Sequence, residues 1–155
     1  MTPCLERFAA RPGFLDWNDA DWGIRHGFLV LLGVLSGDDE TDAKLLADKI
    51  VKLRVFSDEN GKMNRSLADV GGEVMVVSNF TLAANYRHGN RPDFLRAAPP
   101  AEADRLYCRF VQLVIDAGVP TKTGVFGADM QIQTTADGPI TIVMDSAVLR
   151  KEPKS

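Results

Sequence analysis

Two short motifs carry the residue types best suited to chemistry in this chain. The first, Ser78-Asn79-Phe80-Thr81-Leu82, directly follows the apolar run Val74-Met75-Val76-Val77. A buried strand at that run would deliver fixed backbone N–H groups and small polar side chains to the rim of a pocket. Donors aimed at a developing oxyanion often make the largest catalytic contribution, about 3 kcal/mol for one donor. The motif therefore favours electrostatic stabilisation of a transition state.

A side-chain nucleophile is less well supported by the sequence. Ser78 and Thr81 are the hydroxyls in the most suggestive position, but neither lies in a Gly-x-Ser-x-Gly elbow. The chain has two histidines, His26 and His88, that could activate them. A distant Asp or Glu could still act as the base, and the commoner role of a Ser or Thr after a strand is capping or turn formation. We therefore expect the substrate to bring its own nucleophile or base.

The second motif, Asp137-Gly138-Pro139-Ile140-Thr141, is a Gly-Pro step between two strand-like segments. Gly138 permits close approach and unusual dihedrals, whereas Pro139 removes a backbone donor and stiffens the chain. Such a step leaves main-chain carbonyls without partners in a strand ladder. The alternative is a plain turn between strands, and the sequence leaves the isomer of the peptide bond open.

A basic loop follows the first motif. Arg87, His88 and Arg91 lie among Gly and Pro residues, and Arg96 lies just beyond them. The formal net charge of −3 argues against a protein that coats nucleic acid nonspecifically, because such binding uses many cationic contacts to phosphate. A local basic rim remains compatible with that charge. The loop is therefore a candidate site for nucleic acid, and a solvated surface loop is the alternative.

Length and composition indicate an ordinary globular domain. The 155 residues, 45% hydrophobic and 25% charged, predict one domain over residues 1–150 and a tail over 151–155. No basic leader with an apolar stretch begins the chain, and no run approaches the ~18 apolar residues of a membrane span. We therefore expect a cytoplasmic protein without a membrane partner.

The cysteines suggest no metal or redox site. Cys4 and Cys108 are interpreted as reduced packing residues, because a single disulfide would be unusual in a chain of this kind. Together with two histidines they do not make a plausible four-ligand zinc site. We expect neither a metal nor an organic cofactor.

The elements that position the motifs follow from periodicity. The apolar run 28–34 predicts a buried central strand, and helical spacing of apolar residues predicts a helix over 42–52, capped by Asp38, Asp39 or Thr41. Strands are predicted at 53–56, 73–77, 130–134 and 140–144, with a turn at 57–62. A second helix opens at Pro99-Pro100 and ends before Gly118. These elements indicate an α/β fold with two main helices.

Taken together, these motifs resemble the D-aminoacyl-tRNA deacylase family over nearly the whole chain. Collinear segments carry the resemblance with little need for gaps: 27–34, 42–44, 53–56, 61–67, 69–72, 78–82, 89–92, 123–128 and 137–141. The resemblance implies a single-domain fold with a β-sheet or barrel-like core, and hydrolysis of the ester between a D-amino acid and the terminal adenosine of tRNA. Glycine mischarged on tRNA is a further family substrate.

The resemblance also implies a site that two subunits share. Ser78, Asn79, Phe80 and Thr81 would form the reaction centre, where the backbone around Phe80 and Thr81 steadies the ester carbonyl and the RNA 2′-hydroxyl takes part. In a homodimer the Gly138-Pro139 turn of one subunit would enter the other's pocket, hold the substrate amino group and exclude an L side chain. The remaining predicted substrate contacts are Ala136, Phe126 and Met130, and the predicted tRNA contacts are Arg87, Arg91 and Arg96.

This chain departs from the family pattern at several positions. Asn79 replaces the usual Gln of Ser-Gln-Phe-Thr, and Ala136 replaces the Asn that stands two residues before the Gly. The segment 5–8 takes the place of the family's first strand, and 11–17 contains Pro and Gly where a hairpin is expected. Two alternatives follow from these departures: a divergent paralogue that edits another mischarged tRNA, or a catalytically silent dimer that binds tRNA or a protein.

Overall fold

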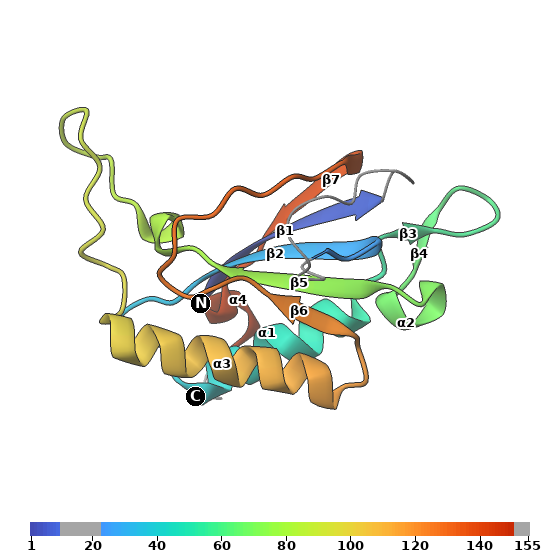
Figure 1. The fold of residues 1–155 in the computed structure, drawn as a ribbon, viewed down its shortest axis with the longest axis horizontal. Helices are drawn as coiled ribbons and strands as arrows, with labels where there is room; N and C mark the ends of the chain where they lie inside the picture. Colours follow the sequence, from blue (N-terminus) through green and yellow to red (C-terminus); the bar gives the residue numbers. More distant parts are fainter. Residues whose placement is uncertain (10–22, 151–155) are drawn as a thin grey trace, which may run out of the picture.

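Five strands form one mixed sheet in the computed structural model, which describes the backbone of residues 1–9 and 23–150 and the side chains of Met1 and 23–150. The strand order is β6-β5-β2-β1-β7 (Figure 1). The strands are β1 (Thr2–Ala9), β2 (His26–Gly33), β5 (Glu73–Ser78), β6 (Thr121–Thr123) and β7 (Ala136–Val143). β1 pairs antiparallel with β2 and β7, whereas β2–β5 and β5–β6 are parallel. Because β6 and β7 end the order, the described strands form an open sheet.

The central strands β2 and β5 are apolar on both faces, as expected for buried strands. Phe28, Val30 and Leu32 of β2 belong to the main core, whereas Leu29 and Leu31 belong to a smaller cluster on the opposite face. Gly27 begins this pairing with a φ of 150°, and a Cβ atom there would overlap the carbonyl oxygen of Glu73. The close parallel approach of β2 and β5 therefore requires glycine at this position.

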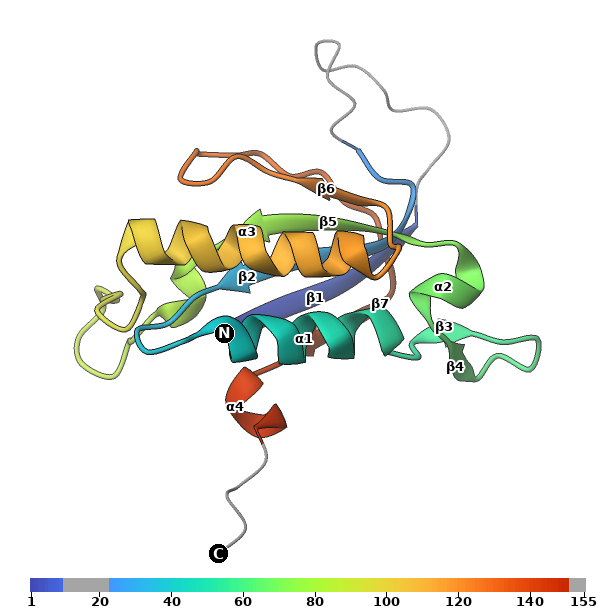
Figure 2. The ribbon, with the colours of Figure 1, turned by 90° about the horizontal axis from the view of Figure 1, so that it is seen from below.

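Two long helices, α1 (Glu40–Lys52) and α3 (Pro100–Asp116), lie side by side on one face of the sheet (Figure 2). Asp39 caps α1 by accepting hydrogen bonds from the N–H groups of Thr41 and Asp42. It is one of the three residues predicted as possible caps. α3 begins at Pro100 and buries Leu106, Tyr107, Phe110 and Val114 against the sheet. Both predicted helices are confirmed.

Short elements complete the fold. These are the hairpin of β3 (Phe56–Ser57) and β4 (Met63–Arg65), the helices α2 (Leu67–Val70) and α4 (Ser146–Leu149), and the 3₁₀ helix η1 (Phe80–Ala83). α4 is tied to α1 because Arg150 Nε and Nη2 bind the buried Asp42 carboxylate at 2.8 and 2.5 Å. The Met1 ammonium donates to Ser146 Oγ at 2.7 Å. No helix in the described part of the chain is long and apolar enough to cross a membrane.

Three sequence-based predictions of elements need correction. The segment 53–56 is mostly not a strand, because Leu53 is the C-cap of α1 and donates its N–H to Ile50; β3 begins only at Phe56. Residues 130–134 form no strand, and the last strand already begins at Ala136. Gly138-Pro139 therefore lies within β7 rather than in a turn between strands.

The remaining predictions concern the two cysteines, the first strand and the segments 11–17 and 151–155. Cys108 is free but exposed on α3, so its predicted packing role is wrong, whereas the side chain of Cys4 lies outside the described residues. Burial and the Asp104 carboxylate raise the pKa of the Cys108 thiol. The segment 5–8 lies within β1, so a first strand is present there despite its unusual sequence. The predictions for 11–17 and for the tail 151–155 also lie outside the described residues.

Candidate active site

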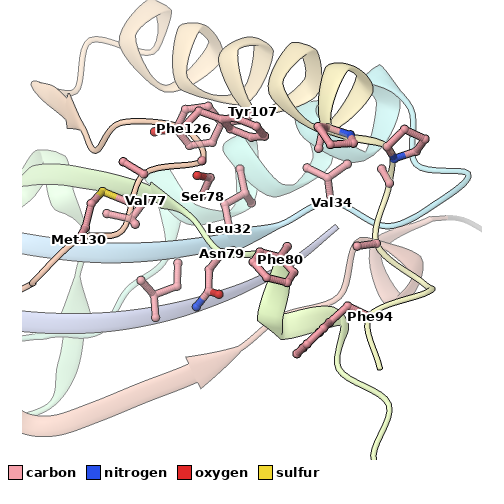
Figure 3. A pocket seen from close by; sticks show the side chains of 18 of the residues that line it. Leu32, Val34, Val77, Ser78, Asn79, Phe80, Phe94, Tyr107, Phe126 and Met130 are labelled. Atoms are coloured by element: carbon pink, nitrogen blue, oxygen red, sulfur yellow. The ribbon is translucent and has the colours of Figure 1, made fainter. Parts of the chain in front are cut away.

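A pocket of about 950 Å³ opens where β5 ends, beside the start of α3 (Figure 3). Its walls come from the end of β2, the Ser78–Phe80 turn, the segment 94–100 and the loop after β6. Its lining is mostly apolar and aromatic, with Leu32, Val34, Phe80, Phe94, Ala98, Ala103, Tyr107, Phe126, Met130 and Ile132 among its members. A concave apolar pocket with a few polar groups is the usual form of a small-molecule site.

The outer wall of the pocket is tied to the central sheet by backbone hydrogen bonds. Ala98 N donates to Val34 O at 3.0 Å, and Ser36 N donates to Arg96 O at 2.9 Å. The Phe94 ring meets the Phe80 ring edge-on, with centroids 5.0 Å apart. The wall and the Ser78–Phe80 turn are therefore held in one arrangement.

Tyr107 fixes the inner wall. Its hydroxyl donates to Val76 O at 2.9 Å, beside the Gly124 N–H, which donates to the same carbonyl at 2.9 Å. The ring packs near Phe126, with centroids 5.9 Å apart. Burial raises the pKa of Tyr107 to about 12, so the phenol is neutral at pH 7. Tyr107 thus joins α3 to the β5–β6 edge directly behind the pocket.

The Ser78–Thr81 turn is built by the end of β5 and by Asn79. Asn79 N donates to Leu32 O at 2.8 Å, which extends the β2–β5 pairing beyond Ser78. The Asn79 backbone is extended, and its side chain caps η1. Asn79 Oδ1 accepts the backbone N–H of Thr81 at 3.1 Å and also the Thr81 hydroxyl. A short amide at position 79 therefore folds back onto its own turn.

Some donors of this turn remain available to a ligand. Within residues 1–9 and 23–150, the Phe80 N–H and the Ser78 hydroxyl have no hydrogen-bond partner. The Phe80 N–H is unpaired because it begins η1, where backbone donors have no intrahelical acceptor. The Thr81 N–H, by contrast, is engaged by Asn79. The backbone donor that the turn offers is thus Phe80 N–H.

The pocket is nearly free of titratable side chains. Of the described residues that line it, only Tyr107 can ionise, and no carboxylate, imidazole, amine or guanidinium is among them. The distant Asp or Glu left open as a base is therefore not part of this lining. A reaction here would rely on backbone donors and on groups that the substrate brings. No cluster of three potential metal ligands occurs among the described residues.

Phe126 and Met130 lie where the sequence places them, in the pocket lining with Ser78, Asn79 and Phe80. Met130 approaches Gly124 closely: a Cβ atom on that glycine would lie 2.7 Å from the Met130 sulfur. Thr81 is not in the lining, and its hydroxyl is turned to Asn79. The loop after β6 thus brings its two predicted residues into one pocket lining with the Ser78–Phe80 turn.

Ala136, Gly138 and Pro139 are not part of the pocket in this chain. All three are exposed on β7, which lies at the opposite edge of the sheet from β6. The Gly138–Pro139 peptide bond is cis. β1 pairs regularly with β7 up to Glu6–Thr141 and resumes at Phe8–Ala136, so the Gly-Pro step forms an irregularity between these pairs. One subunit alone does not bring the two motifs together.

Arg87, Arg91 and Arg96 are exposed on the excursion between η1 and α3. A pair of backbone hydrogen bonds between Asn85 and Asp93, at 2.8 and 2.9 Å, closes this loop at its base. Figure 1 shows the loop projecting outward beyond the sheet, between η1 and the start of α3. The three predicted tRNA contacts are therefore exposed on a segment whose return through Phe94 and Leu95 lines the pocket.

Sequence reasoning missed Phe94, Ala98 and Tyr107 as pocket residues. Tyr107 lies on the apolar face of α3, where its spacing is indistinguishable from that of core residues. Phe94 and Ala98 belong to a segment without periodicity. Backbone pairing of residues 96–98 with residues 34–36, and the ring contact of Phe94 with Phe80, place them. A single helical or strand pattern carries no signal for such contacts.

The chain matches the family model described as D-Tyr-tRNA(Tyr) deacylase over residues 18–145. It is 56% identical over 119 residues to a D-aminoacyl-tRNA deacylase of Ruegeria pomeroyi, covering 77% of this chain and 82% of the relative. A D-aminoacyl-tRNA deacylase of Thermomicrobium roseum is 54% identical over 127 residues, covering 82% of each chain. The sequence is thus similar to these proteins over most of its length.

Two solved structures share the fold. A chain described as c-Myc DNA Unwinding Element Binding Protein superposes with a TM-score of 0.81 at 34% identity, covering 94% of this chain and 98% of its own. A probable eukaryotic D-amino acid tRNA deacylase superposes with a TM-score of 0.72 at 18% identity, covering 93% of this chain and 99% of its own. The latter likeness bears on the fold alone.

Proposed function

Because the chain belongs to the D-Tyr-tRNA(Tyr) deacylase family, we propose that it hydrolyses the ester between a D-amino acid and the terminal adenosine of tRNA. The observation that carries this proposal is the Ser78–Phe80 turn. It presents an unpaired backbone N–H in an apolar pocket whose described lining holds no acid, base or nucleophile ionised at pH 7. A substrate that already contains an activated ester and a neighbouring hydroxyl suits such a site.

In this mechanism the Phe80 N–H donates to the ester carbonyl oxygen, and its hydrogen bond strengthens as negative charge develops there. Water adds to the carbonyl carbon, the bond to the ribose oxygen breaks, and that oxygen leaves with a proton. The RNA 2′-hydroxyl, adjacent to the ester, assists the proton transfer. The Ser78 hydroxyl and the Asn79 amide nitrogen are further polar groups at the same turn.

We also propose that two subunits complete the site. Gly138 and Pro139 are exposed on β7 and lie apart from their own pocket, which suits insertion into the pocket of a second copy. There the backbone carbonyls of the step accept hydrogen bonds from the substrate ammonium, with Ala136 beside them. An L side chain would clash with this backbone, so chirality is tested without contact to the rest of the side chain. The barrel-like core is also part of this proposal: the open sheet of one chain would be completed into it in the dimer.

The remaining residues bind the rest of the substrate. Phe126 and Met130 form an apolar wall against the terminal nucleoside, and the exposed Arg87, Arg91 and Arg96 attract the acceptor phosphates. Glycyl-tRNA is a further substrate in this proposal, since it has no side chain to exclude. The proposed place of action is the cytoplasm, where charged tRNA is used.

Turnover of D-Tyr-tRNA and L-Tyr-tRNA by the purified protein tests the function. We expect rapid deacylation of the D-ester and little deacylation of the L-ester. Activity confined to another mischarged tRNA would show that the protein is instead a divergent paralogue that edits that tRNA. Tight tRNA binding without turnover of any ester would instead identify a silent binding protein.

A further inference from the structure

The loop that Asn85 and Asp93 close exposes an aromatic ring beside cationic side chains. Tyr86 is 80% exposed, although large aromatic side chains are usually at least partly covered. Its ring makes no aromatic contact with another described residue. The other tyrosine, Tyr107, is 5% exposed and hydrogen-bonded. Tyr86 thus contributes nothing to the core and presents its faces to solvent.

The hydrogen bonds that hold the shape of the loop do not involve the guanidinium groups of its arginines. Asn85 Nδ2 donates to Asp93 Oδ2 at 2.8 Å, and Leu95 N donates to Asp93 Oδ1 at 3.2 Å. Asn85 Oδ1 accepts the Arg87 N–H at 3.2 Å, which fixes the backbone directly after Tyr86. Both oxygens of the Asp93 carboxylate are therefore engaged in the scaffold of the loop.

Asp93 is also the only carboxylate in the segment 84–98. Arg87, Arg91 and Arg96 accordingly form no ion pair with any described residue. The arginines of α3 and the C-terminal segment behave differently: Arg105, Arg109 and Arg150 each bind a carboxylate. Three guanidinium groups on one short segment thus stay unneutralised, which favours an anionic partner.

The position of the loop identifies the part of the partner that reaches it. η1 leads into the loop, and the chain returns from it through Phe94 and Leu95, which line the pocket. A nucleic acid that leaves the pocket on the side of Phe94 and Leu95 would run along this rim and reach the loop. The unpaired nucleotides before the terminal adenosine of tRNA have exposed bases and phosphates, which match an aromatic face among arginines.

We propose that Tyr86 is a stacking platform for an unpaired base of the tRNA 3′ end, next to the nucleotide held in the pocket. This inference rests on the proposed function, because it takes tRNA as the substrate. Stacking is tolerant of base identity, and Arg87 and Arg91 fix the adjoining phosphates electrostatically. The platform increases affinity for the polynucleotide and takes no part in the chemistry of the ester.

The kinetic test compares two substrates, D-Tyr-tRNA and the D-tyrosyl ester of adenosine, which ends before the platform. For Tyr86→Ala we expect KM on D-Tyr-tRNA to rise about ten-fold with kcat unchanged, and no change on the adenosine ester. Tyr86→Phe keeps the ring and should behave as the parent. Met63→Ala, which truncates an apolar side chain that is 56% exposed on the distant β3–β4 hairpin, is the matched control.

A binding measurement separates this inference from the deacylase reaction itself. Uncharged tRNA with 2-aminopurine next to its terminal adenosine should lose fluorescence on binding the parent and Tyr86→Phe, because the base stacks. Tyr86→Ala should leave that fluorescence largely unquenched at saturating protein.

Equal quenching by Tyr86→Ala and the parent, or equal KM values on D-Tyr-tRNA, would overturn the platform even if the parent is an active deacylase. Quenching that depends on Tyr86 in a protein without esterase activity would uphold the platform and refute the function. Saturable binding of a protein fragment by this loop, with no affinity for tRNA, would assign it to another class of partner.

Discussion

Asn79 Oδ1 accepts hydrogen bonds from both the backbone N–H and the hydroxyl of Thr81. The bifurcated contact holds the Thr81 proton away from the pocket and fixes the first turn of η1. A hydroxyl whose proton is committed in this way is poorly placed to be activated as a nucleophile, and no base among the described side chains is hydrogen-bonded to it. We therefore assign Thr81 to positioning.

This assignment predicts different results for two substitutions. Thr81→Ser keeps the hydrogen bond to Asn79 and should retain most of the deacylase activity. Thr81→Ala loses that bond, typically worth ~0.5–1.5 kcal/mol, and should lower kcat/KM about three- to ten-fold. The measurement is steady-state deacylation of D-Tyr-tRNA. An aminoacyl ester trapped on Thr81 during turnover would show that the residue is a nucleophile after all.

The basic loop should govern the salt dependence of tRNA binding. Replacing Arg87, Arg91 and Arg96 together by Ala should weaken binding and reduce the slope of log K against log salt by about 2, since each lost phosphate contact on a single strand is worth about 0.7. The fold should be unaffected because none of the three guanidinium groups forms an ion pair with a described residue. Arg109→Ala is the control, because it also removes one positive charge from an exposed arginine, but that arginine is paired with Glu40 and lies outside the loop. An unchanged slope in the triple variant would assign the loop to solvent.

A substitution of Ala136 tests the proposed role of the Gly138–Pro139 step in chiral selection. Ala136 is exposed two residues before Gly138, and an Asn there could hydrogen-bond nearby main-chain groups. Ala136→Asn should therefore fix the Gly138–Pro139 step more firmly and raise D-Tyr-tRNA turnover or its preference over L-Tyr-tRNA. A misplacement of about 1 Å at a positioning element can cost about a hundred-fold in rate. Ala101→Asn on the exposed face of α3 is the control. Lower activity with unchanged chirality would indicate that Ala136 is already adapted to its site.

Acid stability should depend on the pair formed by Asp42 and Arg150. Hydrogen bonds from Arg150 hold the pKa of the buried Asp42 carboxyl well below its usual range. A carboxyl whose pKa is lowered on folding stabilises the protein above its ordinary pKa, and this contribution is lost as the pH falls toward the lowered value. Arg150→Ala should therefore lower the free energy of unfolding at pH 7, and lower it by less below pH 3.

Urea unfolding at pH 7 and at pH 2.5 checks this prediction. Arg65→Ala breaks the exposed pair with Glu59 and should cost less than about 1 kcal/mol, which makes it a suitable reference. An equal loss for Arg150→Ala at both pH values would mean that Arg150 acts through packing rather than charge.

The long elements were predictable because their sequence signals are local. α1, α3 and the two central strands combine clear periodicity or continuous apolar runs with caps. The prediction of a strand at 130–134 was wrong because the alternating apolar residues of this segment do not pack in a sheet. Met130 and Ile132 line the pocket, and none of the described strands pairs with them. Alternation describes one-sided burial, which a loop over a pocket also produces.

The site was predictable in part for the same reason. Ser78, Asn79 and Phe80 follow directly from the end of β5, and the structure gathers them with Phe126 and Met130. Tyr107 and Phe94 join through contacts between distant segments, which no window of sequence contains. The engagement of the Thr81 N–H by Asn79 likewise depends on the fold of the turn itself.

The hydrogen bonds between Asn85 and Asp93 separate the seven residues 86–92 from the pocket walls. Because the closure lies at the base of the loop, substitutions or changes in length beyond it leave Phe94 and the Ser78–Phe80 turn in place. If the proposed function holds, changes in this loop should alter the affinity for tRNA while the Ser78–Phe80 turn keeps its geometry. The loop is thus built as a separable unit, and a graft of residues 86–92 between relatives should transfer tRNA preference without transferring the catalytic rate.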